Sequence, residues 1–208
     1  MRFLLIILLS TLVISQDKTI ELDNIFNGDF SSSSIGRFDW VNGEDAYYFS
    51  ESDSDGKHFY KYNLASDDTT KAFSIDTDTI DRFSSTFNND QTKLLLKTNS
   101  VQIWRHSSYG TYHVYDIKTE SIQSVSDEPD SLRNVKFSPN SDYISYVRND
   151  NNLYIYSLAS LEQTQLTFDG SETILNGHFG WVYEEEFGSY DAYRWSPNSQ
   201  YIAFCRED

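Results

Sequence analysis

A segment that occurs four times constrains the fold of this chain more than any other feature of its sequence. Each copy begins with an aromatic residue, passes through a polar turn and then enters an apolar run. Within these runs apolar and polar positions alternate, which indicates half-buried strands of a sheet. The lead residues recur about every 50 residues and are Trp40, Phe87, Phe137 and Trp195.

A second pattern recurs inside the first three of these units. It is a strand that ends in Tyr-x-Leu or Tyr-x-Ile, at residues 60–64, 113–117 and 154–158. Each unit therefore predicts three strands joined by turns, followed by a fourth. A four-stranded unit repeated every ~40 to 50 residues is typical of a β-propeller blade. A β-sandwich with accidental similarity is the alternative, and the shared register of the four turns favours the propeller.

The number of repeats limits how much of a propeller these residues can form. The 208 residues hold three full units and the start of a fourth, whereas propellers close with about four to eight blades. We therefore expect an all-β, incomplete β-propeller of about three to four blades over residues 37–208, as in a truncated gene product or a fragment. The interval from Phe137 to Trp195 is the longest of the three, which predicts an insertion there.

The first 15 residues are predicted to be a signal peptide. Arg2 supplies the positive charge, residues 3–14 are mainly apolar, and Val13-Ile14-Ser15 is an acceptable cleavage site. The apolar stretch is shorter than the roughly 20 residues that span a bilayer. A cleaved signal, and hence a secreted or extracytoplasmic protein, is therefore favoured over the alternative of an uncleaved membrane anchor.

Residues 16–36 are predicted to be a lead-in segment ahead of the first blade. Thr19 is expected to cap a short helix that ends near Phe26. The serine-rich residues that follow are expected to connect this helix to the propeller.

The charge and the sparse cysteines exclude several classes of partner and cofactor. The formal net charge is -16, and such a surface repels nucleic acid and anionic lipid. No nucleic-acid partner is therefore expected, and membrane attachment would require the N-terminal anchor. The single cysteine, Cys205, cannot form a disulfide within the chain. The four histidines are scattered without an His-Glu-x-x-His pattern, so neither a metal nor another cofactor is expected.

Three consecutive carboxylates interrupt the repeat in the predicted insertion. Glu184, Glu185 and Glu186 lie in an aromatic segment bounded by Gly180 and Gly188. Consecutive like charges repel, so a folded protein keeps them together only in water or against a cation. Taken alone, such a run is a solvated acidic surface. Its aromatic context makes it a candidate ligand site.

Two motifs together resemble the N-terminal propeller of the dipeptidyl peptidase IV family of serine exopeptidases. They are Trp104-Arg105-His106-Ser107 and Trp181-Val182-Tyr183-Glu184-Glu185-Glu186, the second followed by Trp195-Ser196-Pro197-Asn198. Ile174-Leu175-Asn176-Gly177, upstream of the glutamates, adds to the similarity. The resemblance covers most of the chain from about Thr19 onward and is strongest after Val101.

The resemblance implies an eight-bladed propeller that precedes an α/β-hydrolase domain, in enzymes that release N-terminal dipeptides. It also implies that a short helical insertion carries the glutamates into the central cavity. There Glu185 and Glu186 would bind the free N-terminus of the peptide substrate, and Arg105 would contact a substrate carbonyl. Glu184 is the weakest candidate, with a structural role as its alternative. The resemblance further allows a dimer.

The chemistry of the implied site is consistent with that role. A free amino terminus is a compact cation with three donors, and two carboxylates can accept charge-assisted hydrogen bonds from it. Without the ligand the two acids would repel each other, and Arg105 would offset that repulsion. A site that accepts only a free terminus fixes how many residues reach the nucleophile.

The chain also departs from the family pattern. It contains no Gly-x-Ser-x-Gly nucleophile elbow, so no catalytic residue is expected and the chain alone is predicted to be inactive. Trp104, Trp181 and Trp195 are expected to be packing aromatics, and His106 and His178 to be surface or structural residues. The alternatives are a non-enzymatic secreted propeller that binds peptide N-termini or another protein, and a propeller whose acidic run is incidental.

Overall fold

The computed structural model describes residues 20–32, 36–126 and 131–208, and the chain divides into two compact units, Met1–Gly36 and Arg37–Asp208. The predicted signal peptide at residues 1–15 and Thr19 lie outside the described residues. Neither of the described helices, α1 in the first unit and α2 in the second, has the length and apolar character needed to cross a bilayer.

The first unit contains the short helix α1 (Leu22–Phe26), which begins later than predicted. Its N-cap is Glu21 rather than Thr19. The Asn24 side chain reaches back and accepts a hydrogen bond from the Glu21 N–H at 3.0 Å. Because this contact spans three residues, it fixes the helix start at Glu21, as a capping box does.

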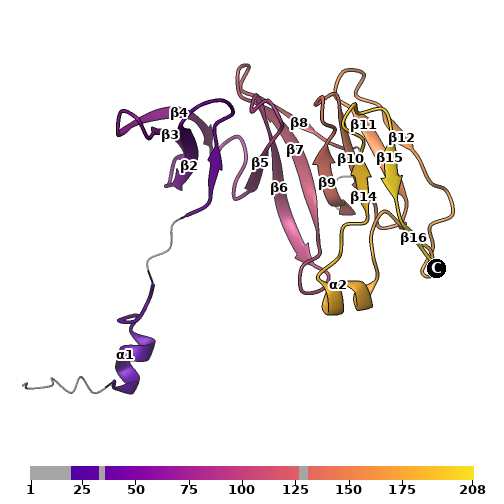
Figure 1. The fold of residues 1–208 in the computed structure, drawn as a ribbon, viewed down its shortest axis with the longest axis horizontal. Helices are drawn as coiled ribbons and strands as arrows, with labels where there is room; N and C mark the ends of the chain where they lie inside the picture. The colour runs from indigo at the N-terminus through magenta and orange to yellow at the C-terminus, as the bar shows by residue number, and fades with distance from the viewer. Residues whose placement is uncertain (1–19, 33–35, 127–130) are drawn as a thin grey trace, which may run out of the picture. The chain divides into compact units, whose positions relative to one another are not determined.

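In the second unit, three antiparallel sheets of four strands follow one another along the chain (Figure 1). The first sheet comprises β1 (Phe38–Trp40), β2 (Ala46–Ser52), β3 (Gly56–Asn63) and β4 (Asp68–Asp76). The second comprises β5 (Ser84–Phe87), β6 (Lys93–Gln102), β7 (Ser108–Asp116) and β8 (Ser121–Ser124). The third comprises β9 (Arg133–Phe137), β10 (Tyr143–Val147), β11 (Leu153–Ser157) and β12 (Gln163–Gln165). In each sheet sequence neighbours pair, as in the blades of a propeller.

The third sheet is followed by two short strand pairs and the predicted insertion. Strand β13 (Leu175–Asn176) pairs with β16 (Arg206–Glu207), and β14 (Tyr193–Trp195) pairs with β15 (Ile202–Phe204). Helix α2 (Trp181–Phe187) lies between β13 and β14 in the chain. The fold-class prediction, an all-β chain of propeller blades with a short helix that carries the glutamates, is confirmed.

The predicted turn has the same construction in every unit. The lead aromatics end β1, β5, β9 and β14. The residue after each of them donates its N–H to the carbonyl five positions further on, at 2.8–3.1 Å. The donors are Val41, Asn88, Ser138 and Ser196. The sequence repeat therefore reflects a local hydrogen bond in each turn, which sets the register of the strand pair.

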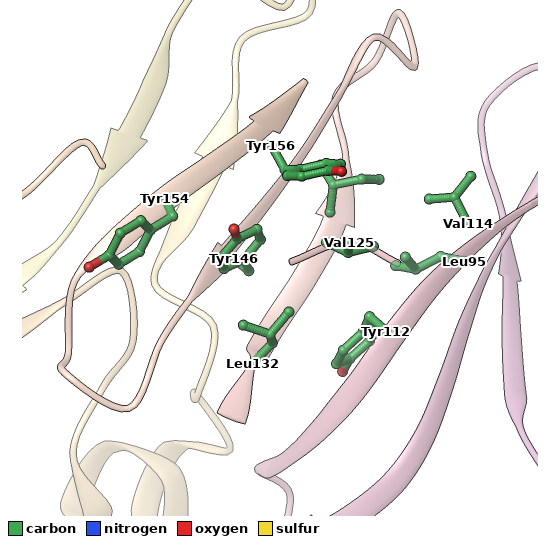
Figure 2. Packing of buried hydrophobic residues seen from close by; sticks show 9 residues of the cluster. Leu95, Tyr112, Val114, Val125, Leu132, Tyr146, Tyr154 and Tyr156 are labelled. Carbon is green, nitrogen blue, oxygen red and sulfur yellow. The ribbon is translucent and has the colours of Figure 1, made fainter. Parts of the chain in front are cut away.

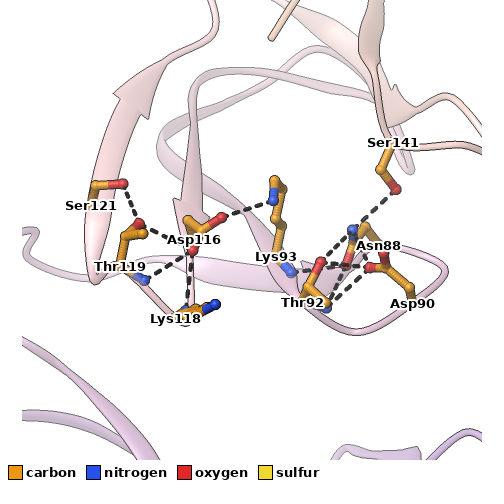
Figure 3. A network of polar contacts seen from close by, with 9 residues as sticks. All are labelled: Asn88, Asp90, Thr92, Lys93, Asp116, Lys118, Thr119, Ser121 and Ser141. Carbon is orange, nitrogen blue, oxygen red and sulfur yellow. Dashed lines mark hydrogen bonds and ion pairs between the residues drawn. The ribbon is translucent and has the colours of Figure 1, made fainter. Parts of the chain in front are cut away.

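Adjacent turns are also joined to each other, and Asn88 is the centre of one junction (Figure 3). Its Oδ1 accepts the backbone N–H groups of Thr92 and Lys93 at 3.0 and 2.9 Å. Its Nδ2 donates to Ser141 Oγ, in the turn of the next sheet, at 3.0 Å. This buried amide thus closes its own turn and connects the second sheet to the third.

We expect Asn88→Ala to lower the free energy of unfolding by about 2 kcal/mol, because it removes the side-chain acceptor of the Thr92 and Lys93 N–H groups and the contact with Ser141. Asn89→Ala is the matched control, since the exposed Asn89 side chain makes one bond, to the Pro139 carbonyl. Urea unfolding followed by circular dichroism measures both variants. Equal decreases in the free energy of unfolding for the two substitutions would show that the hydrogen bonds of Asn88 do not stabilise the junction between the sheets.

The core lies between consecutive sheets, and β6 is buried on both faces. Leu94 and Leu96 pack with Phe59 and Ile75 of the first sheet. Leu95, on the opposite face, belongs to a cluster shared with the third sheet (Figure 2). The other buried members of that cluster are Tyr112, Val114, Val125, Leu132, Ile144, Tyr146, Tyr154 and Tyr156. The sheets therefore pack face to face, as propeller blades do.

Candidate functional site

Helix α2 is fixed at both ends by the residues that flank it. At its start, Gly180 is the N-cap, and the Gly180 N–H donates to Glu207 Oε2 of β16 at 2.8 Å. At its end, Gly188 adopts a left-handed φ of 63° and its N–H donates to the Glu184 carbonyl at 3.0 Å. A left-handed residue is a common helix terminator, and glycine adopts it without steric cost. This short helix therefore presents its glutamates in defined directions, each rotated by about 100° from the last.

Glu184 points into the protein and is fully buried, with 0 % of its surface exposed. Its Oε1 accepts two backbone N–H groups of the β6–β7 loop, from His106 at 2.5 Å and from Ser107 at 2.8 Å. Burial alone would raise the pKa of this carboxyl. The hydrogen bonds from Ser107 and His106 and the positive charge of Arg133 outweigh burial and lower the pKa below its ordinary value. Glu184 is therefore ionised and connects α2 to the loop.

Glu185 and Arg105 are brought together by the same loop. Arg105 Nε lies 2.9 Å from Glu185 Oε2. The Glu185 side chain is 18 % exposed, whereas the Arg105 side chain is 69 % exposed. The ion pair therefore sits at the surface, with the guanidinium mostly in solvent and the carboxylate largely covered.

Glu186 differs from both of its neighbours. Its side chain is exposed. Among the described residues it has no hydrogen-bond or ion-pair partner. The helix thus places a free carboxylate directly after one that is already paired with an arginine.

Residues 88–208 match the family model described as "Dipeptidyl peptidase IV (DPP IV) N-terminal region". The chain belongs to this family. Dipeptidyl aminopeptidase B of Saccharomyces cerevisiae is 46% identical over 121 residues, which cover 57% of this chain and 14% of that protein. A probable dipeptidyl-aminopeptidase B of Sordaria macrospora is 33% identical over 208 residues, which cover 91% of this chain and 22% of that protein.

A solved structure of Porphyromonas gingivalis dipeptidyl peptidase 4 is similar in fold as well as in sequence. It superimposes with a TM-score of 0.78 at 28% identity, over 92% of this chain and 28% of that chain. The chain therefore spans 14% to 28% of the lengths of these relatives. It is a DPP IV-like N-terminal propeller region, and the resemblance to this family predicted from its motifs is confirmed.

The aromatic residues of this DPP IV-like region fall into two groups. Trp195 packs against Tyr143 and donates its Nε1–H to Ser145 Oγ at 2.7 Å, so its predicted packing role holds. Trp181 is 54 % exposed on α2, and a packing role does not hold for it in this structure. Phe187, at the end of α2, is also exposed. The glutamates therefore lie on a helix that presents aromatic surface as well as charge.

Two residues of the site were not found by sequence reasoning. Arg133, at the start of β9, is only 2 % exposed, and its charge acts on Glu184. Glu207 of β16 caps the N-terminal end of α2 through Gly180. A lone arginine or glutamate in a strand gives no signal of burial or capping, so only the fold reveals these contacts. Within the described ranges no group of three or more His, Cys, Asp or Glu side chains is arranged to hold a metal ion.

Proposed function

We propose that this chain is the substrate-binding propeller part of a DPP IV-like serine exopeptidase, and that Glu185 and Glu186 bind the free N-terminus of a peptide. The relatives are named dipeptidyl aminopeptidases or a dipeptidyl peptidase. Release of an N-terminal dipeptide requires a nucleophile, and these 208 residues contain no Gly-x-Ser-x-Gly elbow. The role proposed for this chain is therefore recognition of the terminus.

The observation that carries the proposal is the exposed carboxylate of Glu186, which has no ion-pair partner in the part of the chain that the structure describes, beside the Arg105–Glu185 ion pair. An α-ammonium has three N–H donors and a single positive charge. It can donate to the free Glu186 carboxylate and to the Glu185 oxygen that Arg105 does not use. Charge-assisted bonds of this kind are roughly twice as strong as neutral ones. A blocked, uncharged N-terminus offers neither the charge nor the donors.

Arg105 supports the proposal in two ways. Its charge offsets the repulsion between adjacent carboxylates before a ligand arrives. Its Nε is used by Glu185, and the rest of the mostly exposed guanidinium is available to donate to a carbonyl oxygen of the bound peptide. The ammonium and the carbonyl would then be held by neighbouring groups, which fixes how the peptide enters.

The proposal extends to where the protein acts. The predicted signal peptide at residues 1–15 supports an extracytoplasmic protein, and membrane attachment through that segment is the alternative. Outside the cytosol the chain would meet peptides with free N-termini. Immunoblotting of culture medium and of membrane fractions, with an antibody against the propeller, distinguishes secretion from anchoring.

We expect Glu185→Gln and Glu186→Gln each to weaken binding of a Gly-Pro dipeptide amide about 10-fold, because each removes a charge-assisted acceptor. Isothermal titration calorimetry on the purified chain measures the affinity. Glu162→Gln is the matched control, since Glu162 is an exposed acid outside α2. N-acetyl-Gly-Pro-amide should not bind.

Two results would contradict the proposal. Equal affinity for the free and the acetylated ligand would show that the amino group is not recognised. Undiminished binding by a Glu185→Gln, Glu186→Gln double variant would indicate that the acidic run is incidental.

A further inference from the structure

Glu184 has contacts that suit a function of its own within the proposed site. Glu184 holds the backbone of His106 and Ser107, and the next residue, Glu185, holds the side chain of Arg105. Two consecutive helix residues therefore bind three consecutive loop residues. We propose that Glu184 is a positioning residue that sets where Arg105 stands relative to Glu185 and Glu186, and through it which peptide spacing the site accepts. This inference rests on the proposed function.

The two contacts differ greatly in how firmly they can hold the loop. The Arg105–Glu185 pair lies at the surface, where solvent screens the attraction between the two charges. Glu184 is fully buried and accepts two short backbone hydrogen bonds. Hydrogen bonds to a charged group are stronger than those between neutral groups, and backbone donors do not change rotamer. The loop also closes on itself, because the Ile103 and Trp104 N–H groups donate to the Ser107 carbonyl at 2.9 and 3.4 Å. Glu184 fixes this closed loop against α2, and the surface ion pair orients the Arg105 side chain.

The charge of Arg133 stabilises the ionised Glu184. The guanidinium is almost fully buried, and its charge lowers the pKa of Glu184. A buried carboxylate is costly unless an opposite charge or hydrogen bonds compensate it. Glu184 has both, because the loop amides occupy Oε1 and Arg133 supplies the counter-charge. The ionised state that binds the loop is thereby maintained.

The position of the loop determines which spacing between ammonium and carbonyl a bound peptide must have. In the proposed site the ammonium binds at Glu185 and Glu186, while a carbonyl binds at Arg105. The separation between these two contacts depends on the distance from α2 to the loop. Glu184 fixes that distance, so it would allow the site to distinguish an α-amino acid from one with an extra methylene group at the N-terminus.

The test uses Glu184→Ala, which removes the acceptor, and Glu184→Gln, whose amide oxygen can still accept neutral bonds. Hydrogen exchange of the free protein is measured at the His106 and Ser107 amides. We expect exchange about 10-fold faster in Glu184→Ala and an intermediate change in Glu184→Gln, since the amide exchanges from the unbonded state. Glu186→Gln, which does not touch the loop, should leave exchange at these amides unchanged. Amides of the core strand β10 report whether the fold is intact.

The second measurement is the affinity ratio of Gly-Pro-amide to β-alanyl-Pro-amide. A general loss of folded protein would lower both affinities and leave the ratio unchanged. We expect the ratio to fall about 10-fold in Glu184→Ala and to stay near the unsubstituted value in Glu162→Gln.

The outcomes separate this inference from the proposed function. Unchanged exchange at His106 and Ser107 in Glu184→Ala, with β10 intact, would overturn the positioning role. Faster exchange with an unchanged affinity ratio would overturn its link to spacing. A third outcome combines faster exchange in Glu184→Ala with no binding of a free dipeptide by the unsubstituted chain. That outcome would support the positioning of the loop and would contradict the proposed function instead.

Discussion

Tyr193→Ala is expected to destabilise the second unit by about 4 kcal/mol, within the range for removing a large buried aromatic side chain. Tyr193 lies on β14 and packs with Val147 and Leu153 of the third sheet. Its hydroxyl donates to the Asn134 carbonyl at 2.5 Å, and the Lys136 ammonium lies 3.8 Å from its ring centroid. The substitution removes all of these contacts and leaves a cavity. Urea unfolding of the variant and of the unsubstituted chain measures this decrease in the free energy of unfolding.

Two further variants test the cause of that loss. Tyr193→Phe keeps the ring and removes only the hydroxyl, so we expect it to lower the free energy of unfolding by about 1 kcal/mol. Tyr201→Ala removes a largely exposed ring from the turn before β15 and should change it by less than about 0.5 kcal/mol. A loss for Tyr193→Ala no larger than that for Tyr201→Ala would show that β14 does not depend on this packing.

The blade architecture could be predicted because its signal is local. Each turn closes through a hydrogen bond between residues five positions apart, as from Asn88 to Lys93. The residue types that form such a turn must therefore stand at fixed spacing in the sequence. The strands that follow alternate between the two faces of a sheet, so their pattern is visible as well. The lengthened third interval likewise predicted the insertion that contains α2.

The different environments of the three glutamates could not be predicted in the same way. In the sequence they are identical neighbours, and only their rotation around α2 makes Glu184 buried, Glu185 paired and Glu186 exposed. The donors to Glu184 come from a loop 77 and 78 positions earlier. Arg133 is an ordinary strand residue until the fold buries it. The start of α1 was also misplaced, because its N-cap is Glu21 rather than Thr19 and the contact from Asn24 that accompanies this start is not visible in the residue pattern.

His178 is expected to make the stability of the second unit depend on pH between about 4 and 6.5. The imidazole is buried, and its Nε2 lies 2.8 Å from Asn151 Oδ1. Burial, with a further contribution from the charge of Arg133, lowers the pKa of His178 to about 4. The folded protein therefore keeps this side chain neutral at pH values where the unfolded chain, with an ordinary pKa of 6.5, is protonated.

The sign of the effect follows from proton binding. Between pH 6.5 and about 4 the unfolded chain binds a proton at His178 that the folded protein does not, so stability falls as the pH is lowered. A difference of about 2.5 pKa units corresponds to about 3 kcal/mol over that range. Above pH 6.5 both states are neutral, and His178 contributes no further pH dependence.

Urea unfolding of the unsubstituted chain and of His178→Gln, at pH 7 and at pH 4.5, isolates this contribution. His113 also has a pKa lowered by burial, so the slope of the unsubstituted chain contains more than one group and the difference between variants is the informative quantity. We expect most of the pH dependence of stability that His178 causes to disappear in His178→Gln. It should remain in His106→Gln, because the His106 side chain is exposed. Equal pH slopes for the two variants would refute the assignment. His178 lies two residues before Gly180, the N-cap of α2, so its protonation would place a positive charge beside the segment that leads into this helix.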